Sequence, residues 1–196
     1  MGADFIQVRE KDLSDRKLFG LVRSVVAAAH PMGCRVLVNG RADIALAAGA
    51  DGVHLPSTGL RPRSVRSWVP PGFVVGLSVH SRGEALRAER EGADYVLAGP
   101  VYPTPSKLKY GKPLGLRRFA RICRSVRIPV YALGGVHARN IGELRAAGAA
   151  GVAGITLFQR EPCSLRSFDF SAPSSRGVPE GAVKKPAPGP GETVSE

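Results

Sequence analysis

The chain has 196 residues, 43% of them hydrophobic, which is enough for one sizeable core. No apolar run approaches the roughly 20 residues that span a bilayer, and residues 1–9 lack the basic and then apolar stretch of a signal peptide. We therefore expect a cytoplasmic protein that makes no membrane contact. The net charge of +12 suggests nucleic-acid binding, but the arginines are spread over several expected helices and only 6% of residues are aromatic. We expect no nucleic-acid partner, and a basic rim that attracts anionic small molecules instead.

The cysteines are three in number and scattered, at Cys34, Cys123 and Cys163. They show no paired spacing of the kind that metal sites use. We interpret them as reduced, small hydrophobic residues rather than catalytic thiols.

Short apolar runs alternate with amphipathic helical patterns along most of the chain. This alternation is typical of an all-parallel α/β protein. Strands are expected at residues 5–9, 35–39, 52–55, 74–79, 95–99, 130–134 and 152–155, and helices at, for example, 13–29, 82–91, 116–126 and 139–147.

A short phrase, Gly-Ala-Asp or Gly-Ala-Ala, recurs at residues 2–4, 49–51, 92–94 and 148–150. Each of the last three copies follows a helical stretch and opens a strand, as a glycine helix C-cap and a tight turn would require. At the first copy the chain simply begins. We therefore predict an α/β fold, a TIM (β/α)8 barrel that lacks its first strand and helix. The alternative is an open doubly wound sheet, but the sequence has no G-x-G-x-x-G dinucleotide fingerprint.

The composition changes near the C-terminus. We expect residues 1–170 to form the barrel domain, and residues 171–196, rich in Pro, Gly, Ser and Glu, to form a disordered tail.

The first expected strand carries polar side chains at alternating positions, Gln7, Arg9 and Lys11. Alternation places them on one face while the segment stays extended. An amide and two cations on the inner face of a barrel would be costly unless an anion pairs them. The pattern favours a diphosphate-binding role over a plain surface strand.

The loop after the 95–99 strand is rich in proline and in groups that bind anions. Thr104, Ser106 and Lys107 offer two hydroxyls and an ammonium within four residues. We interpret the loop as an anion clamp, with an ordinary surface loop as the alternative.

Two glycines, Gly134 and Gly135, end an apolar strand just before a helix. Their bare N–H groups could approach a phosphate closely, although tight connections also use glycine for steric reasons. Ile155 and Thr156 end the last strand and could complete this nest, because barrels commonly bind phosphate after their last two strands. The histidines at 54, 80 and 137 receive no catalytic role.

The order of these motifs resembles the thiamine phosphate synthase and TenI family. The shared landmarks lie at residues 7–12, 38–39, 50–55, 76–80, 92–96, 99–107 and 133–135. The resemblance implies a transferase that joins hydroxymethylpyrimidine diphosphate to thiazole phosphate and releases pyrophosphate. It implies catalytic roles for Arg9, Lys11, Ser78 and Lys107, and substrate-binding roles for Gln7, Asn39, Thr104, Ser106, Gly135, Ile155 and Thr156.

The resemblance also implies Mg2+ as cofactor, but the usual ligands are absent. The family places an aspartate where this chain has Gly40, and another where it reads Ser57-Thr58-Gly59. Asp43 is nearby but belongs to a helical pattern. We therefore assign no metal-ligating residue.

Other features are similar to the TenI branch, some of whose members are thiazole tautomerases. Residues 39–41 and 54–57 resemble that branch, whereas Pro100 stands where its tautomerases have a histidine. Three hypotheses remain: a synthase, a TenI-type tautomerase, and a non-catalytic phosphate-binding or regulatory barrel. Self-association into a homo-oligomer is a further possibility, because an incomplete barrel exposes a sheet edge.

Overall fold

The computed structural model describes residues 3–104, 112–155 and 157–158. The tail at 171–196 and the end of the barrel domain lie outside these ranges, so the domain division stays a prediction. None of the helices in this part of the chain is long and apolar enough to cross a membrane.

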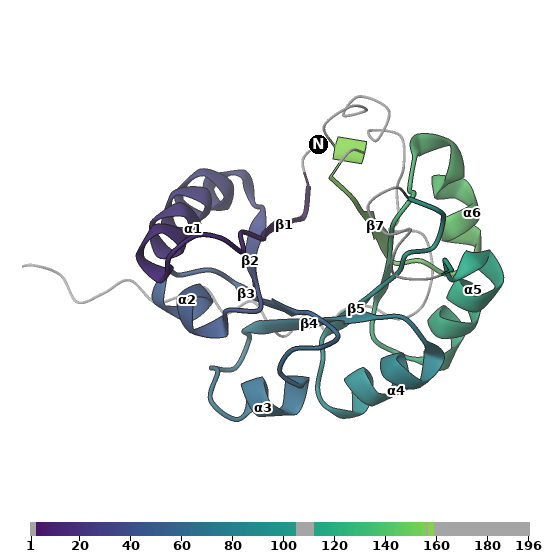
Figure 1. The fold of residues 1–196 in the computed structure, drawn as a ribbon, viewed down its shortest axis with the longest axis horizontal. Helices are drawn as coiled ribbons and strands as arrows, with labels where there is room; N and C mark the ends of the chain where they lie inside the picture. The colour runs from purple at the N-terminus through teal and green to yellow at the C-terminus, as the bar shows by residue number, and fades with distance from the viewer. Residues whose placement is uncertain (1–2, 105–111, 156, 159–196) are drawn as a thin grey trace, which may run out of the picture.

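Seven parallel strands form one sheet whose order follows the sequence, from β1 to β7. Figure 1 shows them curled into an arc with the helices on its outside, and β1 and β7 at its two ends. A sequential order excludes the doubly wound alternative, in which the strand order reverses. The predicted barrel-like α/β fold is confirmed. The strands are β1 (Phe5–Val8), β2 (Arg35–Asn39), β3 (Gly52–Leu55), β4 (Val74–Val79), β5 (Tyr95–Ala98), β6 (Val130–Leu133) and β7 (Gly151–Ala153).

The helices lie close to the predicted ranges, and the helical pattern around Asp43 corresponds to the short helix α2. The α-helices are α1 (Asp15–Ala29), α2 (Ala42–Ala47), α3 (Pro62–Arg66), α4 (Arg82–Arg90), α5 (Gly115–Ser125) and α6 (Ile141–Ala146), and the 3-10 turns are η1 (His30–Met32) and η3 (Ala138–Asn140).

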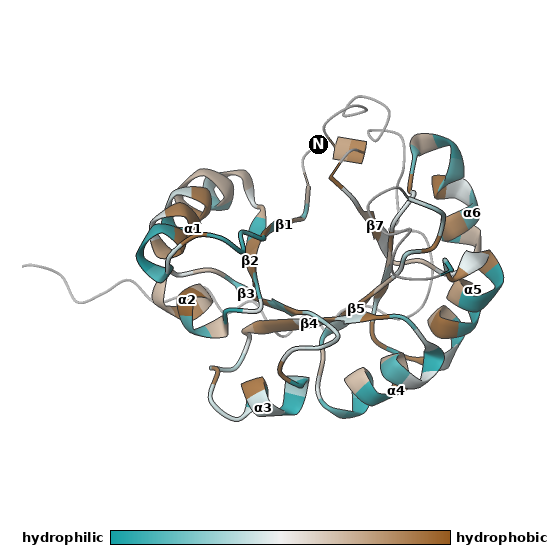
Figure 2. Ribbon diagram, viewed as in Figure 1, coloured by the Kyte–Doolittle hydropathy of each residue, from teal (hydrophilic) through white to brown (hydrophobic). Residues whose placement is uncertain are grey.

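Alternate side chains of each strand face the helices and form the hydrophobic core. Val36 and Val38 of β2 and Val53 and Leu55 of β3 are almost fully buried in this layer. In Figure 2 the helices are hydrophobic toward the sheet and hydrophilic toward the outside. Because side chains alternate along a strand, the intervening residues must point to the inner, concave face of the sheet.

The Gly-Ala-Asp phrase ties a strand to the strand before it. The Asp51 carboxylate accepts a hydrogen bond from the Val36 N–H at 2.7 Å, while the Asp51 N–H donates to the Val36 carbonyl at 2.8 Å. Asp94 and Val75 repeat both contacts, at 2.7 Å and 2.8 Å. The aspartates therefore stabilise the register at the amino-terminal end of the sheet.

The outer copies of the phrase lack this double contact. Ala150 keeps only the backbone bond to Val130, at 2.9 Å, because alanine has no carboxylate. Asp4 precedes β1, and in the described ranges no strand pairs with the outer edge of β1. The arc is thus open at the position where the sequence predicted a missing unit.

The residue after each phrase faces the inside of the arc. Large and small residues alternate there, with Phe5 and Tyr95 on β1 and β5 and Gly52 and Gly151 on β3 and β7. The Phe5 and Tyr95 ring centroids are 6.3 Å apart, and Tyr131 packs edge-on against Tyr95 at 5.5 Å. Gly151 leaves space for the Tyr131 ring, and Gly52 leaves space for Val74 and Leu37.

Gly76 of β4 is the clearest case of a glycine required by packing. A Cβ atom at this position would lie 2.0 Å from Cζ of Tyr95. We predict that Gly76→Ala lowers the free energy of unfolding by about 1–3 kcal/mol, because it overpacks the inside of the arc. Urea unfolding would measure this change.

Gly83→Ala in α4 is the matched control. No atom lies within 4 Å of its would-be Cβ, and alanine favours a helix. The free energy of unfolding of this variant should be higher than that of wild type by about 0.5–1 kcal/mol. Equal stability of the two variants would contradict the packing argument.

Candidate active site

Polar side chains occupy the carboxyl ends of the first four strands on the inner face. They are Gln7 of β1, Asn39 of β2, His54 of β3 and Ser78 of β4. The Gln7 side-chain amide donates to the Asn39 Oδ1 atom at 3.2 Å. The predicted site residues of these strands therefore lie together at one rim of the arc, the rim where barrel enzymes place their active sites.

His54 is the polar centre of the inner face. It is only 2% exposed, and its ring nitrogens contact two hydroxyls, with Nδ1 2.8 Å from the Tyr95 hydroxyl and Nε2 2.8 Å from Ser78 Oγ. Among the described residues, the Tyr95 hydroxyl forms a hydrogen bond with His54 alone, so this hydroxyl donates to Nδ1 rather than remain a buried, unpaired donor. Nε2 then carries the proton and donates to Ser78 Oγ.

Burial keeps this network neutral. It lowers the pKa of His54 to about 4, and the positive charge of Arg9 lowers it further in the same direction. Burial also raises the pKa of Tyr95, which therefore stays protonated. Arg9 follows β1 directly, at the end of the sheet where His54 lies.

The extended segment of β1 is shorter than the sequence suggested. β1 ends at Val8, and a bend begins at Lys11. Strict alternation therefore places Gln7 on the inner face but does not extend to Lys11, which corrects the expectation of one continuous inward face. Arg9 and Lys11 are exposed on the connection between β1 and α1.

The two glycines after β6 lie under the loop that follows β5. Gly134 and Gly135 have φ angles of 92° and 65°, which favour glycine. A Cβ on Gly134 would lie 2.6 Å from Pro100 Cβ, and one on Gly135 would lie 2.7 Å from the Pro103 carbonyl oxygen. The steric alternative therefore accounts for both glycines. The Gly135 N–H forms no hydrogen bond within the described ranges, which leaves it available to an anion.

The remaining predicted residues are only partly visible. Thr104 is half-buried at the end of the loop, and Ile155 is 76% exposed just after β7. Ser106, Lys107 and Thr156 lie outside the described residues.

The side chains at the ends of β2 and β3 do not fit a protein-bound Mg2+. Gly40 carries no ligand, and Ser57 interacts with His80 Nε2 at 3.2 Å. The nearby Asp15 and Asp43 carboxylates are both held by Arg41, at 2.5 Å and 2.7 Å. No cluster of three potential ligands from His, Cys, Asp and Glu occurs in the part of the chain that the structure covers.

The cysteines in view are not activated. Cys34 is buried and Cys123 is half-buried, and burial raises the pKa of both thiols, that of Cys123 to about 12. Cys163 lies outside the described ranges. A thiolate nucleophile is therefore not available from Cys34 or Cys123 at neutral pH.

Two parts of the site were missed by sequence reasoning, Tyr95 and Arg41. Tyr95 occupies the same place after the repeated phrase as Phe5, and comparison of the copies could have assigned it to the inner face. Arg41 gave no such signal, because its partners Asp15 and Asp43 come from two different helices.

The buried histidine makes stability depend on pH. Its pKa is about 4 in the folded state against 6.5 in the unfolded chain, so the unfolded state binds more protons as the pH falls through this window. We predict that unfolding free energy falls by about 2 kcal/mol between about pH 7 and about pH 5 on account of His54. Urea unfolding of wild type and His54→Gln would measure this, since glutamine does not titrate. The same decline in both proteins would contradict it.

Comparison with known proteins identifies the family. The family model described as thiamine monophosphate synthase matches residues 1–158. A Geobacter sulfurreducens protein is 47% identical over 161 residues, which cover 82% of this chain and 76% of that protein. The thiamine-phosphate synthase of Methanoculleus marisnigri is 44% identical, over 79% of this chain and 74% of its own. The solved thiamine phosphate pyrophosphorylase of Pyrococcus furiosus is 35% identical, with a TM-score of 0.73 over 79% of this chain and 74% of that one. The chain belongs to the thiamine monophosphate synthase family.

Proposed function

We propose that this protein is a thiamine phosphate synthase, which joins hydroxymethylpyrimidine diphosphate to thiazole phosphate. The observation that carries the proposal is the set of polar groups at one end of the sheet: Gln7 and Asn39 are hydrogen-bonded, His54 contacts Ser78, and Arg9 and Lys11 follow β1 on the connection to α1. A diphosphate matches this set of groups in charge and in hydrogen bonding. A tautomerase that acts on a monophosphate would not need this number of cations and hydrogen-bonding groups.

The chemistry requires no covalent nucleophile. The bond between the pyrimidine methylene carbon and the diphosphate oxygen breaks, and its electron pair leaves with pyrophosphate. The thiazole nitrogen then supplies the pair that forms the new carbon–nitrogen bond. Arg9 and Lys11 would stabilise the charge on the departing pyrophosphate, and the rim would hold both substrates in line.

Ser78 has a defined part in this proposal. Because His54 donates to its oxygen, the Ser78 hydrogen is directed to another acceptor, and a diphosphate oxygen is the acceptor we propose. His54 itself stays neutral and acts by orienting Ser78, which agrees with its low pKa of about 4.

The thiazole phosphate would bind at the other side of the rim. The Gly135 N–H, which forms no hydrogen bond with a described residue, and the exposed residue Ile155 support this placement. Thr104, Ser106, Lys107 and Thr156 keep the roles that the sequence predicts for them. The cytoplasmic location and self-association also stay predictions.

An assay with both substrates tests the proposal directly. Wild type should release pyrophosphate, and Arg9→Gln should lower kcat/KM for the diphosphate substrate by about 10²-fold, because one charge that stabilises the leaving group is lost. Arg121→Gln, on the exposed face of α5, is the matched control and should retain full activity.

Other outcomes would support the two remaining hypotheses. Proton exchange on thiazole carboxylate phosphate without pyrophosphate release would indicate a TenI-type tautomerase. Residues 39–41 and 54–57, which are similar to that branch, make this the second candidate. Thermal stabilisation by thiazole phosphate without any reaction would indicate a non-catalytic barrel.

The poor fit to Mg2+ has its own test. We predict that Mg2+ alone leaves the Tm of the wild-type protein unchanged, whereas inorganic pyrophosphate raises it. The Tm of Gly40→Asp should increase when Mg2+ is added, because the new carboxylate can bind the ion. A Cβ atom fits at Gly40, since its nearest neighbour, Pro56 Cδ, would be 3.7 Å away. The φ of 70° at Gly40 would cost this variant about 1 kcal/mol. A Tm increase of the wild type with Mg2+ alone would contradict the prediction.

A further inference from the structure

The connection between β1 and α1 is attached at both ends to one turn. Before it, the Gln7 amide donates to Asn39 at 3.2 Å. After it, Asp15, the first residue of α1, is paired with Arg41 at 2.5 Å. Asn39 and Arg41 are separated only by Gly40. The turn at residues 39–41 therefore holds the connection at residues 9–14 from both sides.

The connection has little else to hold it. Its side chains form no hydrogen bond or ion pair with another described residue, and Leu13 is the one residue that packs partly against the core. The connection nevertheless carries Arg9 and Lys11, the two cations of the proposed diphosphate site. Their positions must depend on how the two ends of the connection are fixed.

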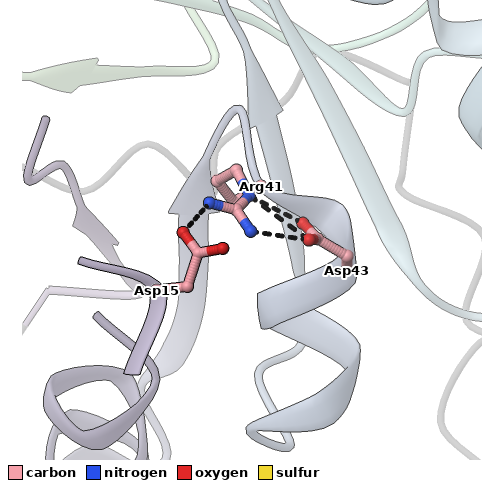
Figure 3. Close-up of polar contacts among 3 residues, drawn as sticks. All are labelled: Asp15, Arg41 and Asp43. Atoms are coloured by element: carbon pink, nitrogen blue, oxygen red, sulfur yellow. Dashed lines mark hydrogen bonds and ion pairs between the residues drawn. The ribbon is translucent and has the colours of Figure 1, made fainter. Parts of the chain in front are cut away.

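Arg41 is well suited to fix one end. Its Nη1 atom donates to the Asp15 carboxylate at 2.5 Å, while Nε and Nη2 donate to the Asp43 carboxylate at 3.0 Å and 2.7 Å. Figure 3 shows the side chain between the two carboxylates, which come from the starts of α1 and α2. A planar group with donors on two edges can bridge two carboxylates in this way, and an ammonium group cannot.

Arg41, Asp15 and Asp43 stabilise one another in their charged forms. Hydrogen bonds to Arg41 lower the pKa of both Asp15 and Asp43, and the two carboxylates raise the pKa of Arg41. Each carboxylate also lies in the first turn of its helix, where negative charge is favourable. Arg41 is already paired twice, so it has little charge left to offer a ligand.

We propose that Arg41 is a positioning residue for diphosphate binding, which acts through Asp15 to hold the segment at residues 9–14 where Arg9 and Lys11 meet the ligand. This inference rests on the proposed function. The bridge is exposed, at 36% for Arg41 and 74% for Asp15, and exposed ion pairs add little to global stability. Its loss should therefore be seen in ligand binding rather than in unfolding.

The test measures the affinity of inorganic pyrophosphate by calorimetry in full-length variants. Arg41→Gln and Asp15→Asn should each weaken binding about tenfold or more, because the cations lose their fixed position. The double variant should be no weaker than either single variant, since the two residues act as one unit. In turnover assays, KM for the diphosphate substrate should rise while KM for thiazole phosphate stays unchanged. Amide hydrogen exchange in residues 9–14 should become faster.

Arg61→Gln is the matched control. Arg61 forms an exposed ion pair with Glu91 at 3.5 Å, between α3 and α4, and its loss should change none of these measurements. Equal pyrophosphate affinity of Arg41→Gln and wild type would overturn the inference. Weaker binding by Arg41→Gln with unchanged binding by Asp15→Asn would also overturn it, because Arg41 would then contact the ligand directly. A wild-type protein that binds no pyrophosphate would instead overturn the proposed function, and this inference with it.

Discussion

The chain of hydrogen bonds from Ser78 through His54 to Tyr95 sets the character of the inner face. Polar atoms enclosed by the sheet must find partners, and these three side chains satisfy one another at 2.8 Å on each side of the imidazole. The chain is possible only because Gly76 leaves room for the Tyr95 ring. The same arrangement brings β3, β4 and β5 into a fixed relation, so that Ser78 faces the rim in one defined orientation.

Charge is distributed unevenly around this rim. The cations Arg9 and Lys11 lie on the connection after β1, whereas the nearby carboxylates Asp15 and Asp43 share one guanidinium, that of Arg41. A departing diphosphate would interact with Arg9 and Lys11, and the same connection also carries the exposed carboxylates Glu10 and Asp12. The catalysis that we propose is therefore electrostatic and positional.

The sequence predicted the strands well and the details of their ends less well. The apolar runs identified all seven strands of the described sheet. Helices cover one face of each parallel strand, so the residues on that face are apolar. Alternation beyond Val8 was wrong for Lys11, because the chain bends there to enter α1. Gly134 and Gly135 were predicted to form a phosphate nest, with a steric role as the alternative; packing against Pro100 and Pro103 supports the steric role, and phosphate binding stays a prediction.

What the sequence determined by itself is local and periodic. The repeated Gly-Ala-Asp phrase, the alternation along strands and the family motifs depend on residues close together in the chain, and they suffice for the fold class and for the family. Tertiary structure alone decided which distant side chains meet. The bridge from Arg41 to Asp15 and Asp43 and the contact between His54 and Tyr95 join residues of different elements. Their pairing depends on how the sheet curls and on how adjacent helices pack against it, and neither is written in any short stretch of sequence.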